Sequence, residues 1–154
     1  MPRGPVHAFA GGAAGAVVAN RLAKNEAPLF QLLETVAGLV GGVHGGLAPD
    51  KLERADTPSH RGPFHSVVGA VISGVAVRRW APEFLEQYRH DLTALREDAE
   101  AETNPLWRLL KWILVLCLHA MVGYGTGFAV GYASHLALDG VLTPSSLPLL
   151  TSGF

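Results

Sequence analysis

The chain has 154 residues, enough for one domain with its own core, and a formal net charge of −1. Charged residues make up 16% of it and its mean hydropathy is +0.25, which is unusual for a soluble domain of average composition. No block of basic residues is present, which argues against a nucleic acid as partner, and the single cysteine, Cys117, excludes an internal disulfide.

The first two predicted segments are apolar and rich in small residues. In residues 7–23, Gly11, Gly15 and Ala19 recur every four positions, the spacing that lets helices approach closely in a membrane. Residues 28–47 follow, and a segment of about 20 apolar residues is long enough to cross the hydrocarbon layer. Both segments are therefore predicted to be membrane-spanning helices.

The second half of the chain alternates polar and apolar segments. Residues 51–63 are predicted to form a polar loop, and the short apolar run 64–77 spans a membrane only if the arginines behind it reach the interface. Residues 82–104 are an amphipathic insertion, expected on the membrane surface or against another helix. Residues 107–138 form the last long apolar segment, with its charges at its start.

Two histidine motifs point to a metal ion. His60 and His65 lie on either side of a Gly-Pro turn, so that one belongs to a loop and the other to the first turn of a helix. His135 and Asp139 are four residues apart on a helix and share one face. An imidazole and a carboxylate at that spacing form a common half-site for Zn²⁺ or a similar ion.

The order of these motifs resembles that of a known family. A Pro-Asp pair ending at Asp50 precedes the HRGPFHS sequence at 60–66 and the SHLALD sequence at 134–139. In this the chain resembles the YdjM-type membrane-bound metal-dependent hydrolases, from His7 to about Pro148. Zinc-dependent phospholipases C, which are soluble α-helical proteins, show a looser likeness.

The resemblance implies a membrane-embedded hydrolase domain and adds ligands to the set. From the residues alone, His7 is equally well a surface histidine, and the resemblance favours a ligand. The family carries a second acid two residues after the Pro-Asp aspartate, where this chain has Leu52. Glu53 or Asp56 could replace it.

Four antiparallel spans would bring all the predicted ligands to one end of a bundle. These ligands are His7, Asp50, His60, His65, His135 and Asp139. Six nitrogen and oxygen ligands exceed the four that one tetrahedral zinc ion binds. The site could therefore hold one ion, with the remaining groups bonded to its ligands, or two ions. The expected cofactor is a divalent metal, Zn²⁺ before Mn²⁺.

The predicted catalytic residues are Asp50 and Arg61. Asp50 could bridge two metals or accept a proton from water, and Arg61 could hold a phosphate oxygen or anchor the chain at the interface. Ser66 and Ser134, each next to a ligand histidine, suit hydrogen bonds that orient the rings.

The remaining histidines receive other roles. His119 lies about 160° around the helix from His135 and is predicted to bond within the bundle. His44 is predicted to be structural, with an approach to the site as the alternative, and His90 to be solvated.

The sequence thus predicts an all-α, multi-spanning transmembrane bundle of about four long helices plus one amphipathic surface helix, all one domain over residues 1–154. The predicted function is metal-dependent hydrolysis of a phosphoester or lipid-linked substrate at the membrane interface. Cationic residues gather at the far end, which places the site on the non-cytoplasmic face of an inner or plasma membrane. The alternatives are a membrane scaffold or effector with a structural metal and a soluble helical metalloenzyme; a homo-oligomer is left open.

Overall fold

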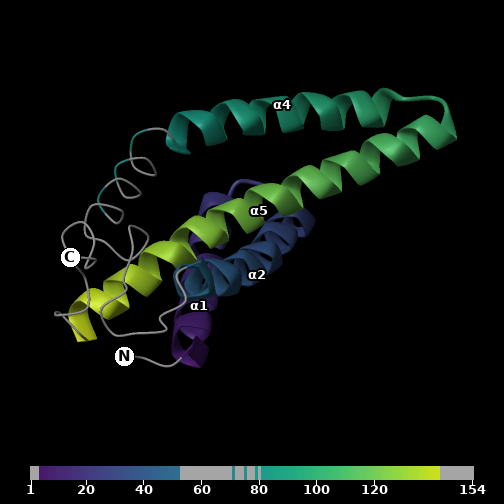
Figure 1. The fold of residues 1–154 in the computed structure, drawn as a ribbon. Coiled ribbons are helices and arrows are strands. Elements are labelled where there is room, and N and C mark those ends of the chain that lie inside the picture. Colours follow the sequence, from purple (N-terminus) through teal and green to yellow (C-terminus); the bar gives the residue numbers. More distant parts are fainter. Residues whose placement is uncertain (1–3, 53–70, 72–74, 76–78, 80, 143–154) are drawn as a thin grey trace.

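The computed structural model describes residues 4–52, 71, 75, 79 and 81–142 (Figure 1). They include four long helices: α1 (Gly4–Leu22), α2 (Pro28–Leu52), α4 (Ala81–Ala101) and α5 (Pro105–Leu142). The predicted all-α class is confirmed for this part of the chain. Most of the predicted segment 64–77 lies outside the described residues.

Three of the helices pack against one another in pairs, and α4 packs on α5 (Figure 1). Helices α2 and α5 run parallel, because Gly38 approaches Gly127 and Gly42 approaches Gly131, while α1 runs in the opposite direction. With 38 residues, α5 is about 57 Å long. Its first turns extend beyond α1 and α2 and are accompanied by α4 alone (Figure 1).

Rows of residues spaced by four form the contact between α1, α2 and α5, and we call these the glycine rows. They are His7-Gly11-Gly15-Ala19 in α1, Glu34-Gly38-Gly42-Gly46-Asp50 in α2 and His119-Gly123-Gly127-Gly131-His135-Asp139 in α5. A Cβ on Gly127 would overlap the carbonyl oxygen of Gly38. Since no glycine in the described residues has a positive φ, glycine is needed here for close approach and not for backbone conformation.

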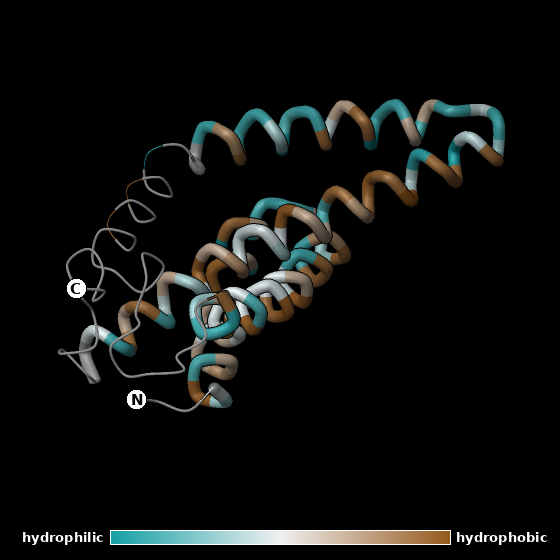
Figure 2. Tube along the Cα trace, in the orientation of Figure 1, coloured by the Kyte–Doolittle hydropathy of each residue, from teal (hydrophilic) through white to brown (hydrophobic). Residues whose placement is uncertain are grey.

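Buried polar side chains and exposed large apolar ones are both frequent among the described residues. The buried polar residues are His7, Glu34, His119, His135 and Asp139, whereas large apolar side chains face outward, such as Phe9 (79% exposed) and Leu32 (62%). Figure 2 shows α4 as mainly hydrophilic and α5 as mainly hydrophobic. Among the described residues, one helix segment, Pro105–Gly140, is long and apolar enough to span a membrane.

Helix α2 is longer than predicted, since it includes Lys51 and Leu52, the first two residues of the expected loop at 51–63. Pro49 lies inside the helix and is fully buried. Its ring lacks an N–H, so one bond to the Gly45 carbonyl is lost, but the helix continues for a further turn. Asp50 therefore lies within the last turn of α2 and not beyond its end.

The amphipathic helix is confirmed, and it packs on α5. Leu92 is its most buried large side chain, at 4% exposure. The turn to α5 is held by Asn104, whose Oδ1 accepts hydrogen bonds from the N–H groups of Leu106 and Trp107 at 3.0 and 3.3 Å. Lys111 pairs with Asp98 and Glu102 at 2.9 and 2.8 Å.

Two glycines in α5 offer a matched test of the glycine rows. Gly127→Ala is expected to destabilise the protein by about 1–3 kcal/mol, because its new methyl group would push α2 away. Gly125→Ala meets no atom within 4 Å and should be neutral or stabilising by up to about 1 kcal/mol, since alanine favours helix. Unfolding in detergent, followed by circular dichroism, measures both; equal effects would contradict close packing of α2 and α5.

The turn between α4 and α5 should weaken in acid. Hydrogen bonding from Lys111 holds the pKa of the Glu102 carboxyl below its usual 4.5, and the Asn104 N–H adds to this. Because the folded pKa is the lower one, the contribution is complete above pH 4.5 and is lost as pH falls through the folded value. The protection of the turn amides, measured as their exchange rate relative to the intrinsic rate at each pH, should therefore fall in acid in the wild type and depend less on pH in Glu102→Gln. Glu97→Gln, at an exposed position of α4, is the control.

Candidate metal centre

Four predicted ligands meet where α1 begins and α2 and α5 end. They are His7 from α1, Asp50 from α2, and His135 and Asp139 from α5. Each lies at or near an end of its glycine row, so the close packing of the helices brings them together. Three of them are buried: the exposed fractions of His7, His135 and Asp139 are 2%, 0% and 3%.

His7, His135 and Asp139 form the tight part of the group. Each offers one ligand atom, and these atoms all lie within 4.8 Å of one another. Nε2 of His7 is 3.4 Å from Oδ1 of Asp139, and Nε2 of His135 is 3.5 Å from Oδ2 of the same carboxylate. The two imidazole rings stack, with centroids 3.9 Å apart. The arrangement presents two nitrogens and a carboxylate to one point.

The orientation of His135 is set by α2. Its Nδ1–H donates a hydrogen bond of 2.6 Å to the Gly46 carbonyl, which fixes the tautomer. Nε2 is thereby directed at the carboxylates of Asp50 and Asp139. A histidine held by a backbone carbonyl through one nitrogen is the usual arrangement for a metal ligand that uses the other.

The spacings suit ligands around a shared ion better than direct bonds. Charge-assisted N–H···O⁻ bonds measure about 2.7–2.9 Å, shorter than the 3.4 and 3.5 Å separations from His7 and His135 to Asp139. For metal bonds of about 2.0–2.2 Å, neighbouring ligands of a tetrahedral ion are about 3.3–3.6 Å apart. The donor set, with nitrogen and oxygen ligands and no sulfur, fits zinc.

Asp50 is the exposed member of the group. Its side chain is 48% exposed and its Oδ1 lies 3.6 Å from Nε2 of His135. It does not belong to the tight group of three. Asp50 can therefore complete the ligand set or meet an incoming molecule, whereas His7, His135 and Asp139 lie behind it.

The other predicted site residues lie outside the described residues. These are His60, Arg61, His65 and Ser66, together with Glu53 and Asp56 as replacements for the second acid. Their place relative to the centre stays a prediction.

The prediction for Ser134 is wrong, because its hydroxyl donates to the Gly131 carbonyl of its own helix at 2.8 Å. Gly46 takes the orienting role instead. His44 is hydrogen-bonded to the Tyr124 hydroxyl at 2.9 Å, as a structural residue. His90 is exposed, as predicted.

A second polar group lies at the opposite end of the glycine rows. Nδ1–H of His119 donates to Oε1 of Glu34 at 2.7 Å, and Arg89 from α4 binds the same carboxylate. Bonding of His119 within the bundle is confirmed, but it faces α2 from the same row as His135. The sequence did not predict that His119 binds Glu34 or that Glu34 binds Arg89. The only indication was that Glu34 is a single acidic residue in an apolar segment.

Comparison of the chain with family models, with curated proteins and with solved structures gives no match. The resemblance to the YdjM-type hydrolases stays a prediction, and the geometry of the centre is the observation that bears on function.

Proposed function

We propose that the chain is a membrane-embedded, metal-dependent hydrolase that acts on a phosphoester. The observation that carries the proposal is the convergence of His7, His135 and Asp139, which are buried and spaced as ligands of one divalent ion. Asp50, half exposed beside them, gives the group an open side. Histidine and carboxylate ligands with an open position are typical of catalytic zinc, whereas structural sites are closed.

Membrane embedding accounts for the distribution of polarity. The outward-facing side chains of α1, α2 and α5 include Phe9, Leu29, Leu32, Leu106 and Met121, each at least 61% exposed. In water such a surface would be costly, but in a bilayer it contacts lipid. We propose that α1 and α2 cross the bilayer beside α5, as a multi-spanning bundle.

The proposed orientation follows from the cationic residues. Arg21, Lys24 and Arg108 lie at the ends of α1 and α5 opposite to the metal centre. Since cationic residues favour the cytoplasmic side, the centre would face the non-cytoplasmic side of an inner or plasma membrane.

The chemistry of the site can be stated residue by residue. A divalent ion there would lower the pKa of a water molecule and polarise a phosphoryl oxygen. His7, His135 and Asp139 would hold the ion, and Gly46 keeps the His135 ring in place. Asp50, half exposed beside them, would accept the proton from the water. A site at the end of membrane helices suits the phosphate of a lipid head group or of a lipid-linked substrate.

The proposed function first predicts that the protein binds a metal ion. Protein freed of metal with a chelator should take up Zn²⁺, and His135→Ala should lose at least about tenfold in affinity, because a buried ligand has been removed. Calorimetry and elemental analysis measure this, and Mn²⁺ serves as the second metal. Zinc at about 100 times its Kd should stabilise the wild type by about 2.7 kcal/mol. His90→Ala, at an exposed histidine of α4, is the control, and equal zinc binding by all three proteins would contradict the site.

Hydrolysis is the second prediction. The zinc-loaded protein, given vesicles of mixed phospholipids, should release a phosphorylated head group or phosphate, detected by phosphorus NMR. Asp50→Asn should lower this rate by about 10²–10⁴-fold while most of the zinc is retained, because Asp50 stands outside the tight group.

The result also separates the enzyme from a scaffold. Full zinc occupancy without cleavage of any phosphoester offered would favour a structural metal. Cleavage that is equally fast in the wild type and Asp50→Asn would remove Asp50 from the proposed chemistry.

A further inference from the structure

Arg89 connects α4 to the buried end of the glycine rows. Its two terminal nitrogens bind the two oxygens of Glu34, at 3.2 and 2.8 Å, and one of them also reaches Oε1 of Glu26 at 2.6 Å. Glu34 is 1% exposed. Burial alone would lower the pKa of Arg89, but the hydrogen bonds and charges of Glu34 and Glu26 raise it by more. The guanidinium therefore stays charged.

Aromatic and polar groups close this cluster on its other sides. His119 donates to Glu34, and Phe30 stacks on the His119 ring with centroids 4.2 Å apart. The guanidinium carbon of Arg96, also from α4, lies 6.0 Å from the centre of the Phe30 ring. Two arginines of α4 thus point at residues of α2.

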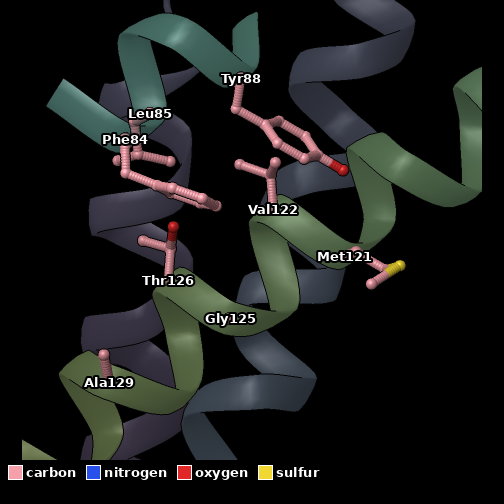
Figure 3. Close-up of a pocket in the computed structure, with 8 residues that line it drawn as sticks. All are labelled: Phe84, Leu85, Tyr88, Met121, Val122, Gly125, Thr126 and Ala129. Carbon is pink, nitrogen blue, oxygen red and sulfur yellow. The ribbon is translucent and has the colours of Figure 1, made fainter. Parts of the chain in front are cut away.

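Apolar packing between α4 and α5 is looser in the N-terminal half of α4, which carries Arg89. A cavity of about 260 Å³ lies between α4 and α5, next to Arg89 in the sequence (Figure 3). Its lining is Phe84, Leu85, Tyr88, Met121, Val122, Gly125, Thr126 and Ala129. Phe84 is 65% exposed, and Gly125 offers α4 no side chain to pack against. Packing between the two helices is therefore incomplete where Arg89 binds.

The other end of α4 is fixed by the turn. Lys111 binds both Asp98 and Glu102, and Asn104 caps α5. Ala99 is fully buried nearby. The helix is thus anchored at its C-terminal end, while its N-terminal half depends on charge.

We propose that α4 is a separable helix, held on the bundle by the Arg89–Glu34 ion pair and able to swing about the 102–104 turn when that pair opens. A single bidentate pair suits this role, because a desolvated carboxylate strongly favours the closed position while its partner is present. Opening exposes the face of α5 that carries Val122, Thr126 and Ala129, which are buried or half-buried beside α4. The device is independent of the metal centre, which involves α1, α2 and α5.

Spin labels on α4 and α2 test the proposal. They are placed at Glu86 and Leu32, two exposed positions outside the cluster, in a Cys117→Ser background. Double electron–electron resonance in detergent should give one narrow distance for the parent protein. In Arg89→Ala the distribution should broaden and move to longer distances. Arg108→Ala, which removes an exposed guanidinium from the first turn of α5, should leave it unchanged.

A charge exchange guards against simple unfolding. In the double variant Glu34→Arg with Arg89→Glu, the narrow α4–α2 distance should return at least in part. Arg89→Lys keeps the charge but cannot make the bidentate contact of a guanidinium, so it should open α4 to an intermediate degree. A second label pair on α1 and α2, at Phe9 and Leu39, reports whether the bundle itself is intact. An unchanged α4–α2 distance in Arg89→Ala would overturn the proposal. So would a result in which Arg89→Ala and Arg89→Lys both lose the α4–α2 distance and the α1–α2 distance to the same extent, since the whole bundle would then have come apart.

Discussion

The backbone contact between α1, α2 and α5 is the constraint on which the rest of the structure depends. At the glycine rows the helices approach so closely that a methyl group on Gly15, Gly42 or Gly131 would overlap a carbonyl oxygen of the neighbouring helix. Such contact gains dispersion energy along the whole interface and leaves little room for larger side chains. Many large apolar residues lie on the outside, and polar residues lie at the ends of the rows.

The two polar clusters are consequences of this arrangement. A carboxylate in a close-packed interior needs a cation, because burial of an unpaired charge is costly. Arg89 supplies that cation for Glu34. At the other end, Asp139 lies 3.4 and 3.5 Å from the Nε2 atoms of two imidazoles, a spacing that suits ligands of one ion, and a metal ion is the proposed counterpart. In this proposal the same physical requirement is met by a side chain at one end and by an ion at the other.

The sequence predicted much of this and failed where tertiary contacts decide. The helices and the meeting of His7, Asp50, His135 and Asp139 followed from apolar length and from direction along the chain. The angle of about 160° between His119 and His135 suggested that they lie on different faces of the helix, but both face α2. A row of every fourth residue turns around the helix by about 40° per step, and a neighbouring helix that crosses at an angle stays in contact with such a row. The partner of Glu34 could not be foreseen, since Arg89 comes from a helix that looked like a surface element.

The difference between the clusters also bears on function. Around Glu34, the described partners Arg89, His119 and Phe30 surround one carboxylate and leave it 1% exposed, so this end is suited to holding helices together. Around His135, three buried ligand groups are followed by an aspartate that is 48% exposed. A group closed on one side and open on the other can exchange a small molecule without disturbing the packing beneath it. The proposed substrate chemistry is therefore assigned to the end that carries Asp50, and the proposed movement of α4 to the end that carries Glu34.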